Sequence, residues 1–136
     1  MTCGLNGTFS YHVHEFAINS TGSCESTGGH LDPLGVGKVP GYVCNPITPK
    51  KCEAGDLSGK HGLLQGTSYG YLTTKYTDEF ISLRGTNNLD NGIIGRSIVI
   101  HSHHSHHIAH GVPAPRIACV NIIKGKCWER NLLCNV

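Results

Sequence analysis

Histidines are the residues of this sequence whose type and spacing could do chemistry. His12 and His14 stand two positions apart in the segment from Thr8 to Phe16, whose alternation of side chains predicts a strand. Alternate residues of a strand face the same side, with Cα atoms roughly 6.5 to 7 Å apart, so two imidazoles at this spacing can converge on one metal ion. Surface histidines that bind nothing show the same spacing, so this pair is weak evidence by itself.

Two further histidines strengthen the interpretation as a metal site, because each stands at the end of an element. His30 ends the glycine-rich stretch 27–30, and His101 closes the apolar run 98–100. Imidazole nitrogens are common ligands of transition metals, so these four histidines are candidates to hold one metal ion together.

The remaining histidines are harder to interpret. A tract between residues 101 and 110 has a composition that could bind copper or zinc, although a polar loop at the rim of the site is the favoured reading; it contains His103, His104, His106, His107 and His110. His61 is interpreted as a structural turn residue rather than a ligand.

The elements that must position these histidines are predicted to be strands. Alternation and β-branched residues favour strands at 8–16, 65–74, 93–101 and 116–123, and a long loop rich in Gly, Ser, Thr, Pro and Asn spans 17–53. The 136 residues suffice for one core. We therefore predict a mainly β fold in a single domain, 1–136.

Charge and hydropathy exclude two classes of function. Eleven basic and nine acidic residues give a net charge of +2 without a basic stripe, so no nucleic-acid partner is expected. No apolar run approaches the roughly 20 residues that cross a bilayer, so no membrane-spanning segment is expected either.

Seven cysteines in so short a chain indicate an oxidising compartment, and we expect an extracellular, secreted or cell-surface protein. The leader of a secreted protein is not present, so the start is interpreted as that of a mature, engineered or truncated chain. Cys44 and Cys52 flank a stretch short enough for a local disulfide. Cys3, Cys127 and Cys134 could supply one more bridge and one odd thiol, with the pairing left open.

Five motifs, in order along the chain, resemble the successive signatures of the copper/zinc superoxide dismutase family. They lie within a matched region that ends at residue 123, before a cysteine-containing tail, 124–136. The motifs are His12-Val13-His14-Glu15-Phe16, Gly28-Gly29-His30-Leu31-Asp32-Pro33, Gly55-Asp56-Leu57-Ser58-Gly59-Lys60-His61-Gly62, Ile93-Ile94-Gly95-Arg96-Ser97-Ile98-Val99-Ile100-His101 and Arg116-Ile117-Ala118-Cys119.

The resemblance implies an enzyme that dismutates superoxide to dioxygen and hydrogen peroxide, with His12, His14, His30 and His101 as copper ligands. It implies that Arg116 attracts superoxide and that His30 dissociates and is protonated when copper is reduced. It also implies a disulfide between Cys24 and Cys119.

The expected metal is copper alone, without zinc. The stretch 31–60 contains no histidine, whereas the family binds zinc through two histidines and an aspartate in this loop. Asp56 matches that aspartate, but Glu53 stands where a zinc histidine would be. This departure resembles the copper-only branch known from fungal extracellular enzymes, in which a glutamate supports the histidine that corresponds to His30. Alternatively, both carboxylates are solvated loop residues.

The family fold implied is a Greek-key β-barrel or sandwich in which three strands precede the His-x-His strand, yet only eleven residues precede His12. We therefore expect this chain to lack the first three strands of that fold. We expect that the chain is part of a longer protein, that a homo-oligomer or partner chain covers the open barrel, or that the tail substitutes in part. The alternative functions are a noncatalytic copper-binding or copper-buffering protein and a structural module; Arg116 favours catalysis, because copper storage does not require it.

Overall fold

The structure is a computed structural model that describes residues 6–68, 72–85, 90–102 and 114–125. The histidine tract 103–110 and the cysteines at positions 3, 127 and 134 lie outside the described residues, so the predictions made for them stay predictions.

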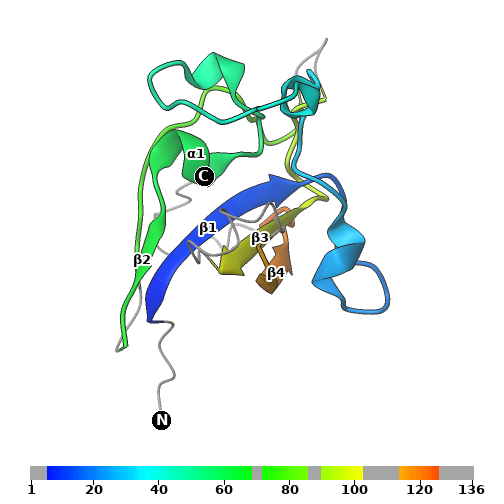
Figure 1. Ribbon diagram of the computed structural model, residues 1–136. Helices are drawn as coiled ribbons and strands as arrows, with labels where there is room; N and C mark the ends of the chain where they lie inside the picture. The colour runs from blue at the N-terminus through cyan, green and yellow to red at the C-terminus, as the bar shows by residue number, and fades with distance from the viewer. Residues whose placement is uncertain (1–5, 69–71, 86–89, 103–113, 126–136) are drawn as a thin grey trace, which may run out of the picture.

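Among these described residues, four strands form one antiparallel sheet in the order β2-β1-β3-β4. The strands are β1 (Gly7–His14), β2 (Leu64–Gly66), β3 (Ser97–Ser102) and β4 (Arg116–Asn121). In Figure 1, β1 crosses the middle of the molecule, with β3 and β4 on one side and β2 on the other. The prediction of a mainly β fold is confirmed.

The strands are shorter than the sequence pattern predicted. Strand β1 ends at His14 because the next two amides turn to another partner: Glu15 N–H donates to Gly29 O at 3.0 Å and Phe16 N–H donates to Thr27 O at 3.0 Å. The strand predicted over 65–74 is limited to Leu64–Gly66 among the described residues.

The long loop predicted over 17–53 contains three single turns of 3-10 helix: η1 (Cys24–Thr27), η2 (Val36–Lys38) and η3 (Pro49–Lys51). Two disulfides tie this loop down, one between Cys24 and Cys119 of β4 and one between Cys44 and Cys52. The loop is therefore fixed to the sheet at one end and closed on itself at the other.

A short helix that the sequence pattern did not predict, α1 (Leu57–His61), packs against β1. Its N-cap is Asp56, whose Oδ1 accepts the Gly59 N–H at 2.8 Å. Lys60 is buried, and its Nζ donates to Asp78 Oδ2 at 2.6 Å and to Ala54 O at 2.7 Å. These contacts explain how a single turn of helix containing a glycine is stable here.

The core lies where β1 meets α1 and the long loop. Its buried members are Tyr11, Val13, Leu31, Ala54 and Leu57. Full burial of an aliphatic side chain such as Val13, Leu31 or Leu57 contributes roughly 2 kcal/mol to stability. The core thereby joins three segments that are far apart in the sequence.

Main-chain hydrogen bonds connect the same three segments around Val13. Val13 N–H donates to Gly55 O at 2.9 Å, Leu31 N–H donates to Val13 O at 2.8 Å, and Gly55 N–H donates to Leu31 O at 2.8 Å. A Cβ at position 55 would collide with the Val13 carbonyl oxygen, so the close approach requires glycine. This junction brings the histidines of β1 next to residues 28–31 and 53–58.

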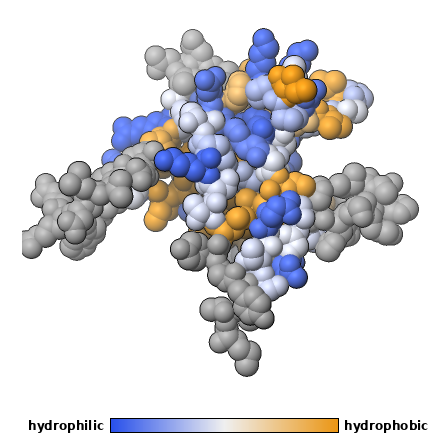
Figure 2. Space-filling view, turned by 90° about the vertical axis from the view of Figure 1, so that its left-hand side faces the viewer, coloured by the Kyte–Doolittle hydropathy of each residue, from blue (hydrophilic) through white to orange (hydrophobic). Residues whose placement is uncertain are grey.

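The surface mixes polar and apolar residues. Figure 2 shows separate hydrophobic patches between hydrophilic areas on one face of the molecule. The exposed apolar residues include Val43 and Ile47 in the long loop and Val120 on β4. Within the described residues, no helix is long and apolar enough to cross a membrane.

Candidate metal centre

Within the part of the chain that the structure describes, four histidines from three segments meet at one point. His12 and His14 come from β1, His101 comes from β3 beside a register shift, and His30 forms an isolated bridge with His14. One ring nitrogen of each lies within 4.8 Å of those of the other three. His12, His14 and His101 are buried, whereas His30 is partly exposed.

Backbone carbonyls fix the tautomers of His14 and His101. His14 Nδ1 lies 3.0 Å from Gly28 O, and His101 Nδ1 lies 3.0 Å from Ala114 O. A carbonyl oxygen can only accept, so both Nδ1 atoms must carry the hydrogen. In the neutral rings both Nε2 atoms then carry lone pairs, and these two atoms lie only 3.3 Å apart.

Both rings are neutral near pH 7. Burial is the main cause that lowers the pKa of His14 to about 4, and burial likewise lowers the pKa of His101. A proton shared between the two Nε2 atoms is therefore disfavoured, and two lone pairs face the same space. A metal cation is the natural partner for this arrangement.

In His12 the two ring nitrogens have the opposite roles, because Nε2 rather than Nδ1 has the polar partners. Its Nε2 lies 3.1 Å from Ser58 Oγ and 3.6 Å from Asp56 Oδ1. Its Nδ1 is buried and has no hydrogen-bond partner among the described residues. Burial is the main cause that lowers the pKa of His12 to about 2, so the ring is neutral near pH 7. With the ring hydrogen on Nε2, beside Ser58 and the Asp56 carboxylate, Nδ1 carries the lone pair.

His30 is held by a carboxylate. Its Nδ1 lies 2.5 Å from Glu53 Oε2, and the Glu53 side chain is only 14% exposed. An ionised carboxylate accepts, so Nδ1 carries the hydrogen and Nε2 is left to a metal. The common centre is thus lined by Nδ1 of one imidazole and Nε2 of three, a donor set that fits copper.

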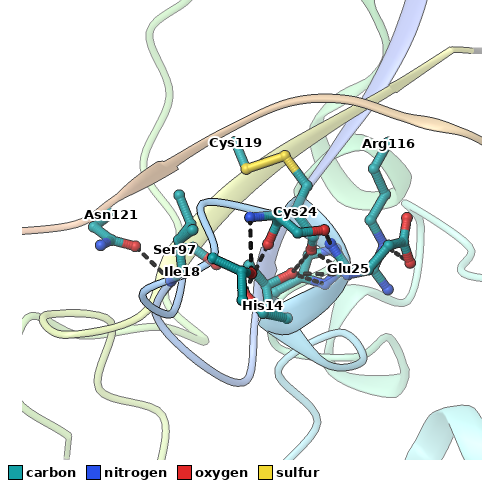
Figure 3. Close-up of a disulfide and its surroundings, with 12 residues drawn as sticks. His14, Ile18, Cys24, Glu25, Ser97, Arg116, Cys119 and Asn121 are labelled. Atoms are coloured by element: carbon teal, nitrogen blue, oxygen red, sulfur yellow. Dashed lines mark hydrogen bonds and ion pairs between the residues drawn. A yellow bond between two sulfur atoms is a disulfide. The ribbon is translucent and has the colours of Figure 1, made fainter.

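Arg116 lies beside the centre and is clamped to the turn that precedes His30. Its Nη1 donates to Cys24 O at 2.9 Å and to Thr27 Oγ1 at 2.8 Å, and its Nη2 donates to Gly28 O at 2.7 Å. Figure 3 shows Arg116 and the Cys24–Cys119 disulfide reaching this turn together. The exposed carboxylate of Glu25 lies 3.5 Å from Arg116 Nε.

Some contacts at the centre have no counterpart in the sequence prediction. Ser58 belongs to a motif quoted above, but its contact with His12 depends on α1, which the pattern does not reveal. Tyr42 lies in the long loop, and its phenol oxygen contacts the Glu53 amide. No spacing rule links positions 42 and 53, so no signal in this single sequence could have found that contact. His61, the expected turn residue, ends α1 and donates to Asp78 at 2.7 Å.

The family model described as copper/zinc superoxide dismutase matches residues 3–122. The chain belongs to this family. A "Cell surface Cu-only superoxide dismutase" of Arthroderma benhamiae is 36% identical over 118 residues, 86% of this chain and 28% of that relative. A "Cell surface Cu-only superoxide dismutase 5" of Candida albicans is 37% identical over 116 residues, 85% of this chain and 42% of that relative. The chain therefore spans less than half the length of these two superoxide dismutases.

The solved structure of Candida albicans superoxide dismutase 5 with Cu(II) resembles this chain with a TM-score of 0.63 and 34% identity. The match covers 93% of this chain and 71% of that one. The expected superoxide dismutase fold and the similarity to the copper-only branch are confirmed by these comparisons.

Proposed function

We propose that this chain binds one copper ion through His12, His14, His30 and His101 and catalyses the dismutation of superoxide. The observation that carries the proposal is the pair of Nε2 atoms of His14 and His101, 3.3 Å apart with both lone pairs inward. The buried, unpartnered Nδ1 of His12 supports it, because such an atom is costly unless a ligand satisfies it.

Copper, when bound, supplies the alternating one-electron oxidation and reduction that turn two superoxide ions and two protons into dioxygen and hydrogen peroxide. The role of Arg116 is to attract and hold the anion. Its two Nη1 hydrogens and one Nη2 hydrogen are directed at the turn 24–28, which keeps the guanidinium beside the histidines. The positive charge and the second Nη2 hydrogen then serve the substrate.

We propose that His30 takes up and releases a proton and that Glu53 holds its ring in place. The His30 side chain is 29% exposed, and it is the one imidazole of the four that is not buried, so solvent reaches it most readily. Glu53 holds the hydrogen on Nδ1, which leaves Nε2 as the atom that can take a proton and return it. Because Glu53 keeps the ring in place, this exchange does not require the loop to move.

We propose copper alone rather than copper with zinc. An oxygen of Glu53 accepts the hydrogen bond from His30. The Asp56 carboxylate accepts the Gly59 N–H and also contacts the His12 ring and the Tyr42 hydroxyl. Both carboxylates then support copper ligands instead of holding a second ion.

The names of the relatives also favour the cell surface as the location of this protein, in agreement with the two disulfides.

A second candidate function is copper binding without turnover. The observation that favours it is the extensive bonding of Arg116 to the turn 24–28, which would give this residue a structural role even without a substrate. A copper-buffering chain and a dismutase therefore differ in what Arg116 contributes to superoxide consumption.

Metal analysis and a superoxide-consumption assay on the same preparation test the proposal. The protein is stripped by mild chelation, loaded with copper, and analysed for bound copper and zinc before the assay. We expect one copper per chain and catalytic consumption of superoxide. One tightly held copper without activity would support the buffering function, and stoichiometric zinc at the four histidines would refute the copper-only site.

A further inference from the structure

Tyr42 lies in the long loop at the point where the two carboxylates of the centre come together. Its phenol oxygen accepts the Glu53 N–H at 2.8 Å, and its hydroxyl lies 3.5 Å from Asp56 Oδ2. Asp56 N–H in turn donates to Glu53 O at 3.0 Å. One side chain thus contacts both residues that support His30 and His12.

The direction of these hydrogen bonds follows from their chemistry. A backbone N–H can only donate and an ionised carboxylate can only accept, so the hydroxyl hydrogen must point to Asp56 while a lone pair faces Glu53 N–H. The phenol stays protonated, because burial is the main cause that raises the pKa of Tyr42 to about 12. The hydroxyl is therefore a neutral bridge between the Glu53 N–H and the Asp56 carboxylate.

The long loop also packs against the Glu53 side chain, through the backbone at Gly37. Asp32 accepts the N–H groups of Val36 and Gly37 at 3.0 and 2.9 Å, which fixes the turn that carries Gly37. A Cβ added at Gly37 would collide with the Glu53 carboxylate. The carboxylate is consequently confined between the backbone at Gly37 and the bond from its own amide to Tyr42.

We propose that Tyr42 is a positioning residue of the copper site, which fixes Glu53 through its main-chain N–H and so sets the orientation of His30. This inference rests on the proposed function, and its effect passes from the phenol oxygen to the Glu53 backbone and then to the Nδ1 of His30. Residues that support metal ligands in this way affect affinity by about 10- to 100-fold, and Tyr42, one step further out, is expected near the lower end of that range.

The test compares the wild-type chain with Tyr42→Phe and with the matched control Tyr76→Phe. The Tyr76 ring stacks on His61, and its hydroxyl is hydrogen-bonded to Tyr11, whose side chain alternates to the face of β1 opposite His12. Its substitution therefore removes a hydroxyl that is bonded to neither Glu53 nor Asp56. In the metal-free proteins we expect faster hydrogen exchange of the Glu53 amide in Tyr42→Phe alone. After copper loading we expect about tenfold weaker Cu(II) binding by chelator competition and an altered Cu(II) EPR spectrum in the same variant.

A double-mutant cycle with Glu53→Ala identifies the route. If Tyr42 acts through the Glu53 carboxylate, Tyr42→Phe should weaken Cu(II) binding much less in the Glu53→Ala background than in the wild type. Full additivity would overturn the inference, as would Glu53 amide exchange in the wild type as fast as in an unstructured peptide. The latter measurement needs no variant, so it decides the matter even if Tyr42→Phe does not fold.

These outcomes are separate from those of the proposed function. A wild-type chain that holds copper but does not consume superoxide refutes dismutation, while amide exchange and EPR still test the role of Tyr42. An active wild type with a Tyr42→Phe variant of equal copper affinity and unchanged EPR spectrum refutes only the role of Tyr42.

Discussion

Arg116 and His14 share one hydrogen-bond acceptor, the carbonyl oxygen of Gly28. The Arg116 Nη2 atom lies 2.7 Å from this oxygen, and the His14 Nδ1 atom lies 3.0 Å from it. The residue that we expect to attract substrate therefore also helps to hold the carbonyl that fixes the tautomer of His14, a proposed copper ligand. Substrate attraction and ligand geometry are coupled through a single backbone group.

Substitution of Arg116 by alanine should lower dismutation by about tenfold or more, because it removes the anion-attracting charge. Loss of its charged hydrogen bonds should also lower the free energy of unfolding by about 2 kcal/mol. Copper content should stay at one per chain, since His14 keeps its own bond to Gly28. Arg116→Lys keeps the charge and should recover part of the rate but not the stability. Loss of copper from Arg116→Ala would mean that the residue is needed to assemble the centre.

Replacement of Glu25 by glutamine should accelerate superoxide capture roughly twofold at low ionic strength. The Glu25 carboxylate lies 3.5 Å from Arg116 Nε, and its negative charge opposes the attraction of an anion. Because its side chain is 76% exposed, the gain should fade as salt is added. Pulse-radiolysis rates of wild type and Glu25→Gln over a salt series would check this. Equal rates at low salt would show that Glu25 does not influence capture.

The metal-free protein should lose stability as the pH falls from 7 to 5. The pKa of His14 is lowered to about 4 and that of His12 to about 2, whereas unfolded histidine titrates near pH 6.5. Below pH 6.5 the unfolded chain therefore binds more protons than the folded chain, and folding is disfavoured. We expect the melting temperature to fall by at least about 5 °C over this interval.

His14→Gln is the informative variant for this pH effect. The substitution removes one buried imidazole that binds a proton only in the unfolded chain. The melting temperature of the variant should therefore depend less on pH between 7 and 5 than that of the wild type. An unchanged dependence would assign the effect to other groups.

The two disulfides should differ in their contribution to stability. Closing a loop restricts the unfolded chain more when the loop is longer, and the sequence separations are 95 for Cys24–Cys119 and 8 for Cys44–Cys52. The chain-entropy relation gives about 4.7 kcal/mol for the first and about 2.6 kcal/mol for the second. Denaturant unfolding of the two paired Cys→Ser variants measures the difference. A larger loss from the short loop would contradict this account.

The sheet strands that carry the site were largely predictable, because they follow strong local rules. The alternation around His12 and His14 reflects one face that packs on the core and one that faces the metal centre. The β-branched run before His101 reflects the inner position of β3. The ends of the strands were less predictable, because β1 stops where the loop residues 27 and 29 take over its amides.

Helix α1 was missed for a physical reason. A five-residue helix with a central glycine has little intrinsic stability, and it depends on the Asp56 cap and the buried Lys60–Asp78 ion pair. Such tertiary contacts leave no periodic trace in the sequence. The same holds for Ser58 and Tyr42, whose roles depend on where the helix and the long loop come to lie.

The strand order places three of the four histidines on the inner strands β1 and β3, which pair over six positions. His30 is attached to them through a bridge and a carboxylate. Openings that detach an edge strand are among the least costly motions of a sheet, and they leave β1 and β3 in register. The three imidazoles on β1 and β3 are therefore held in register by the sheet itself, whether or not a metal is bound.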